Sequence, residues 1–104
     1  FALNENVFIF SRSTLTRYSR GKADLTFDTP NILPDRLILA VESENPLLVG
    51  LDSKNRRLIT WNATNGHIEN QYFSDSLENA TSLSLHGRTV LISTPTETSE
   101  STLP

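Results

Sequence analysis

The chain has 104 residues, of which 37% are hydrophobic and 20% are charged, and its formal net charge is −3. This composition is ordinary for a globular domain, and the acidic balance gives no general attraction to nucleic acid or to anionic lipid. The sequence contains no cysteine, which excludes disulfides, thiolate zinc sites and cysteine nucleophiles, and no apolar run approaches the length of a membrane span.

Short apolar runs recur along the chain with turn-forming residues between them, and each run predicts a strand. No apolar stripe at helical spacing continues over the length of a helix. Many short strands at even spacing favour an all-β sandwich, barrel or propeller. The predicted strands cover residues 7–10, 15–18, 25–27, 37–41, 47–51, 58–61, 71–73, 82–85 and 89–92.

These strands repeat along the sequence. A shift of 43 residues aligns residues 47–49 with residues 90–92. The same shift aligns residues 15–18 with residues 58–61. A period of about 40–45 residues with four strands per unit is typical of propeller blades. The repeat therefore favours a propeller among the all-β architectures.

The second unit has a recognisable order of residues. The segment Leu47-Leu48-Val49-Gly50-Leu51-Asp52 is followed by a polar loop, and the next strand closes on Trp61-Asn62 before a turn that ends at Gly66. This order resembles the WD40 repeat, and its aromatic-turn-Gly ending is also similar to pyrroloquinoline-quinone-type propeller repeats. The resemblance implies a four-stranded blade in which Asp52, Trp61 and Gly66 are structural blade positions.

One feature of the WD40 pattern is missing. The family's Gly-His dipeptide should precede the strand at residue 37, but no histidine lies there. His86-Gly87 has the reverse order and follows the strand at 82–85. The resemblance therefore implies a degenerate blade, held by apolar packing rather than by a polar network that includes such a histidine.

The number of strands predicts an incomplete propeller. Residues 1–92 supply about two and a half four-stranded antiparallel blades, whereas closed propellers have at least about four. We expect a segment of a larger propeller, with a small β-sandwich as the alternative. Residues 93–104 are mostly Ser and Thr with a single apolar residue, which predicts a flexible tail or linker.

No constellation of side chains predicts catalysis, a metal or a cofactor. His67 and His86 are the only histidines, and we expect both in solvent-facing turns. Arg17 and Arg20 lie in a locally basic stretch and are candidates for a phosphate contact. Asn62 and Asn79 each begin an N-x-[ST] sequon and are candidate glycosylation sites.

The sequence therefore predicts a non-enzymatic, protein–protein interaction scaffold, part of a larger WD40-like propeller in a multiprotein assembly. Its partners would be other proteins, either the remaining blades or a partner chain, contacted through loops at 11–14, 53–57 and 64–67. A ligand-binding or catalytic propeller segment, and an RNA-associated scaffold, are the alternatives. A cytoplasmic or nuclear location is favoured, and the two sequons keep the secretory pathway open.

Overall fold

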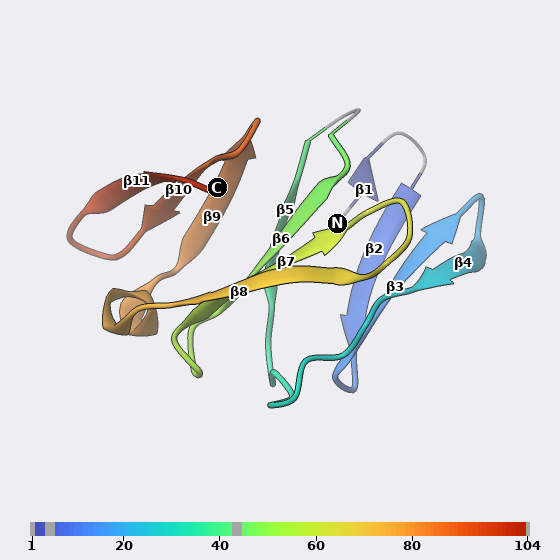
Figure 1. Cartoon of the computed structure of the whole chain (residues 1–104), viewed down its shortest axis with the longest axis horizontal. Coiled ribbons are helices and arrows are strands. Elements are labelled where there is room, and N and C mark those ends of the chain that lie inside the picture. Colours follow the sequence, from blue (N-terminus) through green and yellow to red (C-terminus); the bar gives the residue numbers. More distant parts are fainter. Residues whose placement is uncertain (1, 4–5, 43–44, 104) are drawn as a thin grey trace.

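The computed structural model describes residues 2–3, 6–42 and 45–103, and it confirms an all-β protein built from three open antiparallel sheets (Figure 1). Strands pair in chain order within each sheet, so each sheet is a meander. The first sheet contains β1 (Ala2–Leu3), β2 (Asn6–Ser11), β3 (Thr14–Ser19) and β4 (Lys22–Thr26). The second contains β5 (Ile38–Val41), β6 (Leu47–Asp52), β7 (Arg57–Asn62) and β8 (Ile68–Phe73). The third contains β9 (Ser82–His86), β10 (Thr89–Ser93) and β11 (Thr98–Thr102).

The second sheet lies between the other two and is covered on both faces. Neighbouring residues of a strand point to opposite faces, and β6 is buried along its whole length. Leu48 packs in one apolar cluster with Phe8 of the first sheet. Leu47 and Val49 pack in a second cluster with Val90 of the third sheet. Strands buried on both faces read as continuous apolar runs, which explains the sequence Leu47-Leu48-Val49.

The two connections between sheets follow the same route. Residues 27–37 lead from β4, the last strand and one edge of the first sheet, to β5, which is the first strand and an edge of the second sheet. The short 3-10 helix η1 (Asp75–Asn79) lies on the corresponding path from β8 to β9. Among the described residues, no helix combines the length and the apolar character that crossing a membrane requires.

The first and second sheets also share an irregularity in their pairing. A shift of register in the β3–β4 pair occurs between Arg17 and Tyr18. The β7–β8 pair has the same kind of shift between Thr60 and Trp61, 43 positions later in the sequence. Such bulges bend a strand and strengthen its twist. The two meanders therefore bend at corresponding positions.

The structure differs from the predicted flexible tail at residues 93–104. Thr98–Thr102 forms β11, which pairs with β10 over its whole length, and Leu103 is buried in the cluster between the second and third sheets. The composition suggested disorder because the segment has little apolar surface of its own. Pairing with β10 supplies backbone hydrogen bonds along one side of the strand, and all five of its residues are exposed, which suits Ser, Thr and Glu.

Candidate functional site

Two exposed apolar side chains lie on the connection between the first two sheets. Ile32 and Leu33 have exposed fractions of 59% and 54%. They lie between Pro30 and Pro34, which are buried and whose rings restrict the backbone. The sequence interpretation missed this pair, because it treated the two prolines only as a break between strands. Binding residues are often carried on loops held by a rigid scaffold, so this pair is a candidate contact with another molecule.

A buried ion pair of the second sheet anchors this loop. Asp52 and Arg57 are paired residues of β6 and β7, and Arg57 Nε lies 2.9 Å from Asp52 Oδ2. Each side chain is only 1% exposed. Arg57 Nη1 donates to Gln71 Oε1 at 3.0 Å, and Nη2 donates to the carbonyl oxygen of Ile32. The backbone at the exposed apolar pair is therefore bonded to a buried cation.

Two further contacts hold the end of the loop that leads into β5. Ser13 Oγ donates to the carbonyl oxygen of Pro34 at 3.0 Å. Lys54 Nζ lies 2.5 Å from Asp35 Oδ2. The hydrogen bond from Lys54, together with its charge, lowers the pKa of Asp35, and the same bond raises the pKa of Lys54. Because both side chains are exposed, this pair positions the loop more than it stabilises the fold.

Asp28 holds the other end of the loop. Its backbone N–H donates to the carbonyl of Gly66 at 2.8 Å, and its own carbonyl accepts from Trp61 Nε1 at 3.0 Å. Its carboxylate Oδ2 accepts from the N–H of Ile68 at 3.1 Å and lies 3.2 Å from His67 Nδ1. Two of the predicted structural positions, Trp61 and Gly66, therefore fix where this loop begins.

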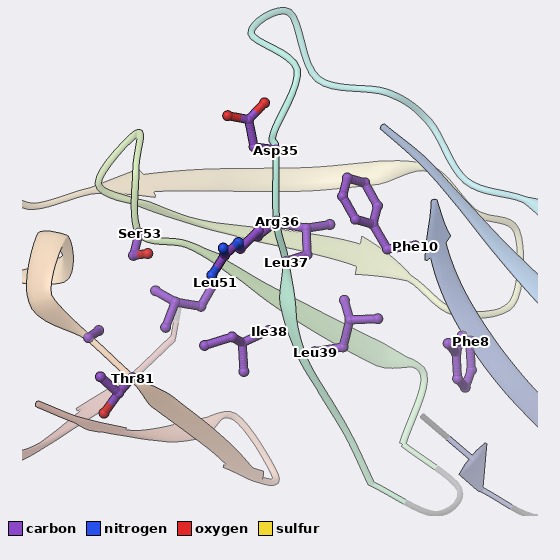
Figure 2. A pocket seen from close by; sticks show the side chains of 11 residues that line it. Phe8, Phe10, Asp35, Arg36, Leu37, Ile38, Leu39, Leu51, Ser53 and Thr81 are labelled. Atoms are coloured by element: carbon purple, nitrogen blue, oxygen red, sulfur yellow. The ribbon is translucent and has the colours of Figure 1, made fainter. Parts of the chain in front are cut away.

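An open groove of about 660 Å³ lies beside the loop and extends over β5 (Figure 2). Phe8 and Phe10 of β2 lie on one side of β5, and Leu51 lies on the other. Asp35 and Arg36 add one charge of each sign. No group of three or more potential metal-ligating side chains occurs in the part of the chain that the structure describes. The groove therefore offers mainly apolar contact with a charged rim.

The structure gives Arg17 a role between sheets. Its Nε and Nη2 lie 2.9 and 3.2 Å from the two carboxylate oxygens of Asp24, and its Nη1 donates to the carbonyl of Ala63 at 2.9 Å. Arg20 lies in the exposed turn after β3, with a φ of +51°. A phosphate at Arg17 would have to compete with this bidentate carboxylate contact.

The two sequon asparagines differ in their surroundings. Asn62 is half-buried, and its Oδ1 accepts from the backbone N–H groups of Thr64 at 2.8 Å and Asn65 at 3.3 Å, which organises the β7–β8 turn. Asn79 is exposed at the end of η1. Asn79 is therefore the more accessible candidate. Of the loops predicted to make contacts, 53–57 adjoins the groove through Ser53.

A second polar cluster joins the second and third sheets. Glu42 Oε1 accepts from the backbone N–H of Gly87 at 2.9 Å, and Oε2 lies 2.9 Å from His86 Nδ1. Asn45 Nδ2 donates to the carbonyl of Gly87 at 2.9 Å. The hydrogen bond from the Gly87 backbone, and then the nearby His86, lower the pKa of Glu42 below its ordinary value. The carboxylate form of Glu42 therefore favours the folded state.

Stability is expected to depend on pH through this cluster. Because the folded-state pKa of Glu42 is lowered, its contribution is complete above the ordinary pKa and is lost as the pH falls through the folded-state value. Urea unfolding of the wild type, Glu42→Gln and the control Glu69→Gln between about pH 6 and pH 3 checks this. Glu42→Gln should lose less stability on acidification than either other protein. Parallel pH profiles for all three would contradict the assignment.

No protein-family model and no curated protein matches this chain.

Proposed function

We propose that the chain is a non-catalytic protein–protein interaction scaffold in which Ile32 and Leu33 contact the partner. The observation that carries this proposal is that two exposed apolar side chains lie on a backbone bonded to the buried Arg57. A surface that is already ordered loses little conformational entropy on binding. A few well-placed apolar anchors commonly supply most of the binding energy of a protein interface.

We further propose that the three sheets are consecutive units of a larger WD40-like propeller in a multiprotein assembly. Support comes from the meander order of each sheet, the matching route of the two connections and the bulges 43 positions apart. Face-to-face packing alone is equally compatible with a β-sandwich. The repeated features are the reason that we favour the propeller.

The groove along β5 supports a second candidate, a ligand-binding unit. Its volume of about 660 Å³ lies within the range of about 300–1,000 Å³ that is typical of small-molecule sites. Its open shape and mixed rim also suit a protein segment that continues from the Ile32–Leu33 contact. An RNA-associated role has less support, because Arg17 is engaged by Asp24 and by the Ala63 carbonyl.

The interaction proposal is tested by capture with matched variants. The full chain, immobilised, is incubated with an extract of its native cells, and the retained proteins are quantified by mass spectrometry. We expect the double variant Ile32→Ser/Leu33→Ser to lose a defined set of proteins by about tenfold, the change expected from removing a contact of about 1.4 kcal/mol.

The control is Leu91→Ser, which also removes an exposed apolar side chain, but from the third sheet. It should retain the same proteins as the wild type. Equal retention by the wild type and the double variant would contradict the role of this pair. Saturable binding of a small molecule that is weakened by Phe10→Ser, with no protein retained, would favour the ligand-binding candidate.

A further inference from the structure

The turn between β7 and β8 contains the dipeptide Asn65-Gly66, and Asn65 is the only asparagine in the sequence that precedes a glycine. In such a pair the backbone nitrogen of the glycine can attack the carboxamide carbon of the asparagine, because glycine has no Cβ to hinder the approach. Asn65 is exposed, whereas Gly66 is buried and has a φ of +81°. The hydrogen bonds of the two residues therefore decide when this reaction can occur.

Both reacting groups are engaged by the turn itself. The N–H of Gly66 donates to the carbonyl of Asn62 at 2.8 Å, and Oδ1 of Asn65 accepts from the N–H of His67 at 2.9 Å. The attack requires the Gly66 nitrogen to lose its proton, so its bond to Asn62 must break. A bond donated by the neutral N–H disfavours the loss of that proton. The closed turn therefore resists the reaction.

Gly66 is also held from the side of the first sheet. Its carbonyl accepts from the N–H of Asp28 at 2.8 Å, and Oδ2 of Asp28 accepts from the N–H of Ile68 at 3.1 Å. A Cβ added at Gly66 would lie 3.1 Å from the carbonyl oxygen of Thr26, at the end of β4. Displacing Gly66 therefore disturbs a contact between two sheets as well as the turn.

We propose that Asn65 is a deamidation site that is protected in the folded protein and reacts when the β7–β8 turn opens. Hydroxide removes the proton of the Gly66 amide, the nitrogen bonds to Cγ of Asn65, and ammonia leaves with a proton taken from water. The product is a cyclic imide. Water then adds to one of its two carbonyl carbons and breaks the C–N bond at that carbon. The net reaction consumes one water, releases one ammonia and leaves aspartate or isoaspartate at this position.

The isoaspartate product should not fit the folded turn. Its backbone runs through Cβ, so the turn gains one atom at the point where Gly66 is held by both Asn62 and Asp28. The isoaspartate form, separated by chromatography, should therefore unfold at a lower denaturant concentration than the Asn65→Asp variant, which has the same charge and a normal backbone. Equal midpoints would show that the turn accepts the longer backbone.

The proposal is tested by comparing reaction rates in the folded and unfolded states. The full chain is incubated in mildly alkaline buffer, with and without guanidinium chloride, and tryptic peptides are analysed by tandem mass spectrometry. Cleavage after Arg57 and Arg88 releases one peptide that also contains Asn70 and Asn79, which serve as internal controls. In guanidinium, Asn65 should react faster than both. In buffer it should react at least about tenfold more slowly, which corresponds to about 1.4 kcal/mol in the activation free energy.

A variant that loosens the turn provides a second test. Asp28→Ala removes the carboxylate contacts with Ile68 and His67 but keeps the backbone bond to Gly66. It should accelerate both deamidation in buffer and hydrogen exchange of the Gly66 amide, because both reactions need the same N–H to open. Asp75→Ala is the control, since Asp75 pairs with Arg56 at the surface. In guanidinium the wild type and both variants should react alike.

Three outcomes would overturn the proposal. Equal rates at Asn65 in buffer and in guanidinium would show that the fold gives no protection. A rate at Asn65 in guanidinium no higher than at Asn70 would show that the dipeptide is not a reactive site. Unchanged deamidation in Asp28→Ala, with faster hydrogen exchange at Gly66, would separate the reaction from opening of the turn. None of these measurements involves a partner, so the role of Ile32 and Leu33 is tested separately.

Discussion

Replacing Arg57 with methionine is expected to lower the free energy of unfolding by about 3–5 kcal/mol, the usual cost of removing one partner of a buried ion pair. Asp52 would remain with a side chain only 1% exposed and without its cation. The carbonyl of Ile32 and the side chain of Gln71 would also lose a donor. A loss of this size is a large part of the total stability of about 5–15 kcal/mol of a typical domain.

Urea unfolding measures this loss, and the neighbouring residue provides the control. Arg56 is half-exposed and pairs with Asp75 and Glu78 at the surface, so Arg56→Met should cost about 1 kcal/mol or less. The double variant Asp52→Asn/Arg57→Met removes both charges and should recover part of the loss. Similar losses for Arg56→Met and Arg57→Met would show that the buried pair has no special role.

Trp61→Ala is expected to cost about 3–5 kcal/mol, the range for deleting a large aromatic side chain from a core. Trp61 is 1% exposed and packs against Phe27, with ring centroids 6.4 Å apart in an edge-to-face arrangement. Its Nε1–H also bonds the carbonyl of Asp28 at the start of the connecting loop. The variant should therefore weaken the packing between the first and second sheets. It should also weaken the attachment of the loop that carries Ile32 and Leu33.

Unfolding of the Trp61→Ala variant is followed by circular dichroism. Fluorescence is not suitable, because Trp61 is the only tryptophan and the variant lacks its signal. Gly50 provides an independent check. A Cβ added at Gly50 would lie 2.8 Å from Trp61 Cζ3, so Gly50→Ala alone should be destabilising. Combined with Trp61→Phe, the same change should cost less, because the smaller ring makes room. Fully additive losses would mean that the two residues do not share this contact.

Much of the fold could be predicted from the sequence because local patterns determine it. Apolar runs separated by turns correctly predict most of the strands, and the three apolar residues at 47–49 reflect a strand buried on both faces. β11 could not be predicted in this way. It contains only Thr, Ser and Glu, and it becomes a strand because β10 offers a backbone to pair with.

The candidate site was harder to predict, because its parts are distant in the sequence. The sequence predicts Asp52 as a structural blade position before a polar loop, and Asp52 does accept from the backbone of Asn55, but its buried partner is Arg57. The sequence placed Arg57 in an exposed loop, whereas the structure begins β7 there and buries it. Its bond to Ile32 spans 25 residues, and no local pattern reports such a contact.

The most direct test of the account is isothermal titration of one captured partner with the wild-type chain and with the Ile32→Ser/Leu33→Ser variant. We predict that the dissociation constant rises by at least about tenfold in the variant, with circular dichroism and thermal unfolding unchanged because both side chains are exposed. Equal dissociation constants for the two proteins would contradict the claim that this anchored apolar pair binds the partner.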